Sequence, residues 1–169
     1  MAATTQIHVF HGAGGTATDI TSTEIRFKRA DNDTVDALNP VPIPTSGTNY
    51  SWRKSTKLRM VTDPANQISN LRFFSSGTAL GTGIVHRLLQ SVSYVQGSSS
   101  DEATSIGGND SVNYTSAAPL SVNSGVVLTA PAAPSYGTQD YLVQQMAVDS
   151  TAAAGTSGVR TYSLRYDES

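Results

Sequence analysis

Short segments of the chain alternate between apolar and polar residues, which is the pattern of strands that bury one face. In residues 24–29, Ile25 and Phe27 fall on one side, and residues 67–74 and 161–166 show similar patterns. Further strand-like segments lie at 112–114, 120–122, 126–129 and 141–148. About eight such segments separated by turn residues predict an all-β protein, a single-domain antiparallel β-sandwich with a jelly-roll-like arrangement.

The clearest alternation runs from Trp52 to Val61. Its expected core side comprises Trp52, Thr56, Leu58 and Met60, and its outer side comprises Arg53, Ser55, Lys57 and Arg59. This pattern predicts a half-buried strand with a basic outer face. We take Arg53, Lys57 and Arg59 as candidate subunit-contact residues, because such a face contacts either solvent or a neighbouring subunit.

A proline-rich segment follows the first acidic turn. Residues 39–44 contain Pro40, Pro42 and Pro44. Alternate prolines fix φ and remove backbone donors, so this segment is expected to be an extended strap at the surface or at a sheet edge, and not a central strand. The three prolines are further candidate subunit contacts.

Other segments predict irregular structure or leave it open. Residues 1–18 are expected to form an extended, flexible N-terminal arm, and residues 19–169 the sandwich domain. Residues 97–111 have almost no apolar content, which predicts a mobile, exposed loop. Residues 149–158 are expected to form a long, solvent-facing hairpin loop. In residues 84–95 both a strand and a short helix remain possible.

The composition favours strands and turns over helices. Ser and Thr together number 42 residues against 24 charged ones, and cysteine is absent. The first residues lack the basic and apolar regions of a signal peptide, and no stretch has the ~20 apolar residues of a membrane span. We therefore expect synthesis in the cytoplasm and no membrane association.

Charge is unevenly distributed, although the net charge is only −2. Residues 1–87 carry nine basic and six acidic side chains, whereas residues 88–169 carry two basic and seven acidic ones. Such a dipolar chain is suited to contacts with copies of itself or with a neighbour. The acidic balance argues against a nucleic-acid partner, and Trp52 is expected on the face opposite the basic residues, so the aromatic and basic parts of a nucleic-acid site are separated.

Candidate catalytic and metal-binding patterns are incomplete. His8 and His11 would point to opposite faces of a strand, and the glycines that follow lack the ending of a phosphate loop. Residues 31–36 begin like a calcium loop but have Asp36 where glycine is required. No nucleophile elbow is present. We expect a protein that is not an enzyme and has neither a cofactor nor a metal site.

Two parts of the chain resemble a known class of proteins. Residues 52–74 and 141–168, the latter ending in the sequence Tyr-Asp-Glu, resemble the small β-sandwich virion proteins of tailed bacteriophages, particularly head decoration or cement proteins. The cysteine-free composition, rich in Ser, Thr, Gly and Ala, and the strap at 39–44 add to the likeness.

The resemblance implies a mechanical role on the capsid surface. Such a protein binds the outside of the major capsid shell and stabilises it, often as a trimer, so the implied partners are the major capsid protein and sister copies in a homo-oligomer. The alternatives are a tail, baseplate or head-to-tail connector component, or a glycan-binding module. In the glycan-binding module Tyr94, Tyr114 or Tyr136 would stack on sugar rings.

Overall fold

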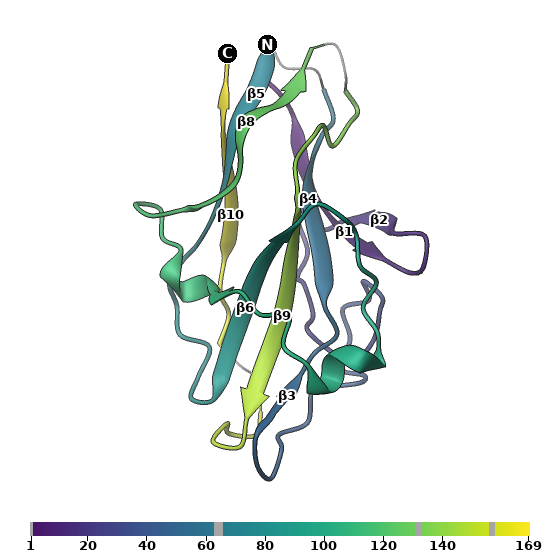
Figure 1. The fold of residues 1–169 in the computed structure, drawn as a ribbon, viewed down its shortest axis with the longest axis vertical. Coiled ribbons are helices and arrows are strands. Elements are labelled where there is room, and N and C mark those ends of the chain that lie inside the picture. The colour runs from purple at the N-terminus through teal and green to yellow at the C-terminus, as the bar shows by residue number, and fades with distance from the viewer. Residues whose placement is uncertain (1, 63–65, 131–132, 156–157) are drawn as a thin grey trace.

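Two antiparallel sheets pack face to face in the computed structural model, which describes residues 2–62, 66–130, 133–155 and 158–169 (Figure 1). The larger sheet contains β1 (Thr5–His11), β2 (Thr16–Asp19), β3 (Thr48–Tyr50), β4 (Lys54–Met60), β6 (Ile84–Ser91), β7 (Asn109–Asp110) and β9 (Tyr141–Asp149). The smaller sheet contains β5 (Gln67–Ser75), β8 (Leu120–Thr129) and β10 (Tyr162–Glu168). The predicted all-β sandwich is confirmed.

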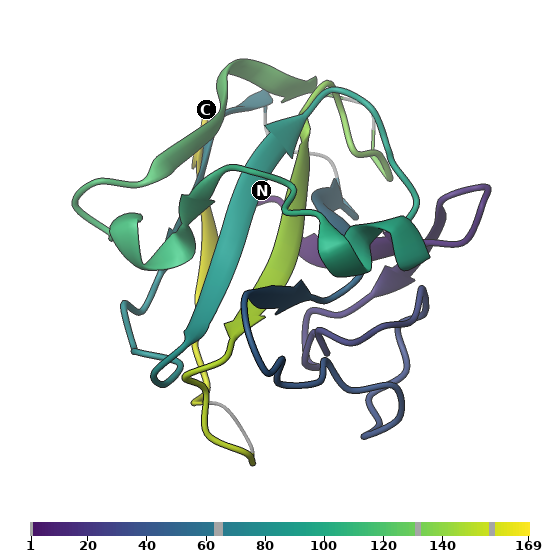
Figure 2. The same ribbon diagram turned by 60° about the horizontal axis from the view of Figure 1, so that its bottom comes forward.

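Strand order follows from the backbone pairing. The larger sheet runs β2-β1-β4-β9-β6-β7, and β3 also pairs with β9; the smaller sheet runs β10-β5-β8. Two short 3-10 helices, η1 (Ser99–Ala103) and η2 (Ser111–Asn113), lie between β6 and β8. The irregular chain between β2 and β3 gathers on one side of the molecule (Figure 2).

The main core lies between the two sheets. The larger sheet contributes Leu58, Met60, Leu88 and Leu142, and the smaller sheet contributes Ile68, Leu71, Phe73, Val122, Val127 and Leu128. Within β5 the pairing register shifts near Asn70, which has a positive φ of 52°. This irregularity lets Ile68 and Leu71 both face the core, although they are three positions apart and would point to opposite faces of a regular strand.

The prediction of a flexible N-terminal arm at residues 1–18 is wrong. Residues 5–11 form β1, which is hydrogen-bonded between β2 and β4 and buries Val9 and Phe10. Gly12 and Gly15 build the hairpin between β1 and β2, with φ angles of 73° and 64°, and the Gly15 amide donates to the Gly12 carbonyl at 3.0 Å. These glycines therefore serve a turn within the sheet.

Residues 24–29 do not form the predicted strand. Their backbone pairs with two separate segments in succession: the Trp52 amide donates to the Lys28 carbonyl, and the Arg29 amide donates to the Asn39 carbonyl. A strand needs a continuous partner, and residues 24–29 have none. They therefore form an irregular segment despite their alternating apolar residues.

Three segments between residues 84 and 129 differ from the prediction or were left open by it. β6 pairs with β9 along its whole length from Ile84 to Ser91, so the helical alternative at 86–90 is wrong. β8 joins two predicted strands, 120–122 and 126–129, into one of ten residues. Residues 112–114 belong to η2 and its C-terminal cap instead of a strand.

Neither predicted loop has the expected form. Residues 97–111 include η1 and β7 and bury Asp101 and Ser111, so the segment is exposed only in part. The described part of 149–158 leads from β9 in the larger sheet to β10 in the smaller one, so it is a crossover between sheets and not a hairpin.

Candidate functional site: a strap and a groove beside strand β10

The predicted strap at residues 39–44 continues a longer segment without strands, residues 35–44, which is called the strap from here on. Hydrogen bonds from other segments hold it in place. The Lys28 ammonium donates to the Asp36 carboxylate at 2.8 Å. The Arg29 amide donates to the Asn39 carbonyl at 2.8 Å, and the side-chain amide of Asn49 donates to the Pro42 carbonyl at 2.8 Å. The strap therefore has a defined path without belonging to either sheet.

The strap exposes apolar side chains to solvent. The exposed fractions are 47% for Val35, 66% for Leu38 and 39% for Ile43. Pro40 and Pro42 are exposed and Pro44 is half-buried, and residues 39–44 contain no strand. The prediction of an extended segment that is not a central strand is confirmed.

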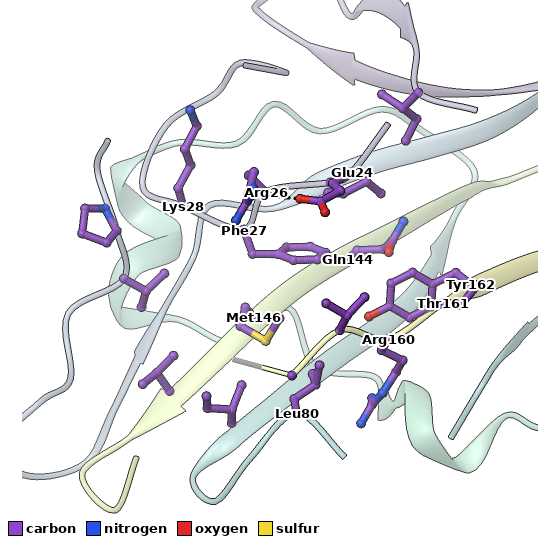
Figure 3. A pocket seen from close by; sticks show the side chains of 18 of the residues that line it. Glu24, Arg26, Phe27, Lys28, Leu80, Gln144, Met146, Arg160, Thr161 and Tyr162 are labelled. Carbon is purple, nitrogen blue, oxygen red and sulfur yellow. Dashed lines mark ion pairs between the residues drawn. The ribbon is translucent and has the colours of Figure 1, made fainter. Parts of the chain in front are cut away.

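A groove of about 860 Å³ lies between the strap, residues 20–28 and the first half of β10. Strands β4 and β9 form its floor with Thr56, Leu142, Gln144, Met146 and Val148. Figure 3 shows Phe27, Met146 and Tyr162 around the opening between these segments. Leu38, Ile43 and the exposed Val159 line its rim, so the apolar surface of the strap continues into the groove.

Every cationic side chain that lines the groove has a carboxylate partner. Lys28 pairs with Asp36 at 2.8 Å, Arg26 with Glu24 at 2.8 Å and Arg160 with Asp110 at 3.2 Å. The hydrogen bond from Lys28 is the main reason why the pKa of Asp36 is lowered. The lining is thus mainly apolar, with its charges neutralised internally.

The three predicted basic contact residues do not form one surface. The strand predicted at 52–61 is confirmed as β4, but it begins at Lys54. Lys57 and Arg59 project to the face away from the smaller sheet, where the Lys57 ammonium lies 3.9 Å from the centre of the Tyr141 ring. Arg53 precedes the strand and pairs with Asp101. Lys57 and Arg59 therefore lie on a partly buried surface, whereas Arg53 belongs to a structural ion pair.

Trp52 was expected on the core side of the strand, but it is not part of the core cluster. It is half-buried, and its indole N–H donates to the Glu102 carboxylate at 2.9 Å. Glu102 also pairs with Arg29 at 3.1 Å. The residues just before β4 therefore fasten η1 to the sheet.

Lys54 is buried beneath the acidic turn that resembled a calcium loop. Its ammonium donates to the carbonyls of Ala30 at 2.8 Å and Asn32 at 2.7 Å. Burial lowers the pKa of Lys54 to about 8. The turn at residues 30–32 thus surrounds a lysine ammonium of the protein itself.

The three histidines occupy separate environments. His8 contacts the Tyr136 hydroxyl at 2.9 Å, and His11 contacts the Thr18 hydroxyl at 3.0 Å. His86 is buried between the rings of Phe27 and Tyr162, and burial lowers its pKa to about 3. Within the described ranges, no group of three or more His, Cys, Asp or Glu residues is placed to hold a metal ion.

The tyrosines named for glycan binding do not share one surface. Tyr94 and Tyr136 pack around Phe10 with Tyr141, at ring distances between 5.2 and 6.3 Å from Phe10. The Tyr94 hydroxyl donates to the Gly12 carbonyl. Tyr114 packs against the core between the sheets. All three rings are thus used to cover apolar residues.

Comparisons with known proteins give no relative to set beside this geometry. No family model matches the sequence, and neither the curated proteins nor the solved structures contain a match. In the part of the chain that the structure describes, no helix has the length and apolar character needed to cross a membrane.

Proposed function

We propose that this protein is a structural component of a tailed-bacteriophage virion, a decoration or cement protein that binds the outside of the major capsid shell and stabilises it. The resemblance of residues 52–74 and 141–168 to such proteins supports this role. The observation that carries it is the strap, which holds apolar side chains in solvent although it belongs to neither sheet.

An ordered, exposed apolar surface is typical of an interaction site. Leu38, Ile43 and Val159 lie around one groove, and contiguous apolar surface of this kind marks contacts with other proteins. Because internal hydrogen bonds already fix the strap, binding to a partner would cost little conformational entropy in this segment. Pro40 and Pro42, two of the candidate contact residues, are exposed on the same segment.

The proposed partners are the major capsid protein and sister copies, arranged as a homotrimer or another homo-oligomer. Each contact through the strap is small. Repeated attachment to one lattice makes the combined affinity large even where each single contact is weak.

A co-sedimentation experiment with capsids tests this function. Purified protein is mixed with capsids of the encoding virus from which this protein has been stripped, and the capsid pellet is assayed for it. We expect wild-type protein in the pellet and loss of binding for the double variant Leu38→Asp, Ile43→Asp, because buried unpaired carboxylates are costly.

The matched control is Val92→Asp. Val92 is 83% exposed and follows the end of β6 opposite to Ile84, which lines the groove. This variant should bind as well as wild type. Absence of wild-type protein from the pellet, or its location in the tail of the native particle by electron microscopy, would refute the capsid role.

A further inference from the structure

Strand β10 forms one end of the smaller sheet. It pairs with β5 along one edge, and among the described residues no strand pairs with its other edge. An end strand offers a row of backbone donors and acceptors to a further strand.

The pairing of β10 with β5 identifies which backbone groups of β10 point away from β5. The Ser76 amide donates to the Thr161 carbonyl at 2.9 Å, so Thr161 turns its backbone toward β5. In an antiparallel pair the next residues alternate, which directs the backbone groups of Tyr162 and Leu164 away from β5. Within the described ranges, no strand pairs with either residue on that outer side.

The groove follows this outer edge. Every residue from Arg160 to Leu164 lines it. Tyr162, Ser163 and Leu164 belong to β10, whose successive side chains point to opposite faces, so a groove that touches all three runs along the edge of the strand. Its floor is apolar around Met146 and Val148, and the buried Gln144 lies beside them.

We propose that the groove receives an extended, uncharged segment of a different polypeptide, which pairs with the outer edge of β10 as an added strand. Backbone pairing with Tyr162 and Leu164 requires a peptide, because only a second backbone supplies donors and acceptors at the matching repeat. The segment is uncharged because each ion in the lining already has its partner, so a charged occupant would be buried without one.

A second copy of this chain does not supply the segment. Among the described residues, one candidate is residues 24–29, but residues 24–28 already line the groove of their own chain, and the backbones of Lys28 and Arg29 are hydrogen-bonded within it. The other is the strap, whose alternate prolines at 40, 42 and 44 remove the donors that pairing needs. The occupant therefore comes from another protein. Any protein with such a segment could bind here. The peptide site can therefore be confirmed or refuted independently of the capsid role.

Selection from a peptide library tests the strand site. A library of random linear seven-residue peptides is displayed and selected on immobilised wild-type protein. We expect selected peptides that are uncharged and alternate apolar residues with a period of two, because every second side chain would face the groove floor. Failure to enrich any peptide, or enrichment of charged peptides, would overturn the proposal.

Two arginine variants locate the binding. Met146 is half-buried in the groove floor, whereas Leu89 lies in the neighbouring strand with its side chain on the opposite face of the sheet. Met146→Arg should weaken binding of a selected peptide by about tenfold or more, and Leu89→Arg should leave it unchanged. Circular dichroism establishes that both variants retain their strand content. Equal effects of the two substitutions would place the peptide elsewhere.

Amide hydrogen exchange of the wild-type protein needs no variant. A selected peptide should slow exchange at Tyr162 and Leu164, whose amides point to the groove, and leave Ser163 unchanged because its amide faces β5. Protection confined to β8, the other end of the same sheet, would assign the peptide to the wrong edge and refute the proposal.

Discussion

The guanidinium of Arg53 is hydrogen-bonded to the carboxylate of Asp101, a buried side chain 48 residues further along the chain. The same carboxylate accepts the backbone amides of Arg53 and Ser98, each at 3.1 Å. One acidic residue thus joins the start of β4 to η1 and satisfies three donor groups from two distant segments.

Loss of this carboxylate should destabilise the fold. For Asp101→Ala we expect the free energy of unfolding, measured by urea denaturation, to fall by about 3 kcal/mol, because an arginine and two amides lose their common acceptor. Glu102→Ala is the neighbouring control. Its side chain is 29% exposed and should cost about 1 kcal/mol. Equal losses would contradict a special role for Asp101.

Phe10 distinguishes a sheet strand from a flexible arm. It is 7% exposed and surrounded by three tyrosine rings, so Phe10→Ala should lower the free energy of unfolding by about 3 kcal/mol. Val92→Ala, at an 83% exposed position, should change it by less than about 0.5 kcal/mol. If Phe10→Ala were as mild as the control, β1 would not be part of the folded sheet in solution.

The lowered pKa of Lys54 predicts that the free energy of unfolding rises in mild alkali. Its folded pKa of about 8 lies below the ordinary value of 10.5, so above pH 8 the unfolded chain binds the proton more readily than the folded protein does. The free energy of unfolding should therefore increase by up to about 2 kcal/mol between pH 8 and about pH 9.5. Urea denaturation of wild type and Lys54→Met across this range measures the effect.

The Lys54→Met variant should lose most of this rise. Higher pH is avoided because the folded pKa of Tyr94 and that of Tyr162 are raised to about 12, so their unfolded forms ionise first and favour unfolding above pH 10. An identical pH dependence in wild type and Lys54→Met would show that other groups cause the rise.

His86 predicts the opposite dependence in mild acid. Its folded pKa is about 3, against an ordinary value of 6.5, so below pH 6.5 the unfolded chain gains a proton that the buried ring does not take up. The free energy of unfolding should fall by up to about 2 kcal/mol between pH 6.5 and pH 5. Denaturation of His86→Leu should show a smaller fall over the same range.

His11→Gln is the matched histidine control for this measurement. The His11 side chain is 20% exposed and lies in the hairpin of β1 and β2, away from the stacked rings around His86. This variant should keep the acid-dependent loss of the wild-type protein. If His11→Gln abolished the loss and His86→Leu retained it, the assignment to His86 would be wrong.

Alternation predicted the strands that have one apolar face and one continuous partner. β4, β5, β9 and β10 follow the sequence pattern closely. The pattern failed where a second condition was needed. Residues 24–29 alternate but have no single partner strand, and residues 12–15 build a hairpin turn that the sequence also allows as a flexible region.

The candidate site was predictable only in part. The prolines of 39–44 alone indicated an extended segment outside the central sheet, because proline removes backbone donors whatever surrounds it. The exposure of Leu38 and Ile43, and the groove beside β10, required the positions of strands that are distant in sequence. Likewise, nothing around Asp101 in the chain signals burial, since its burial depends on Arg53.

The amino-acid sequence by itself determined the class of fold, since short two-periodic segments without cysteine bury apolar area only by forming and stacking sheets. The tertiary structure alone decided which edges remain open, which charges are neutralised and where apolar side chains stay in solvent. Those properties depend on contacts between residues far apart in the chain, whereas strand periodicity is a local property of the backbone.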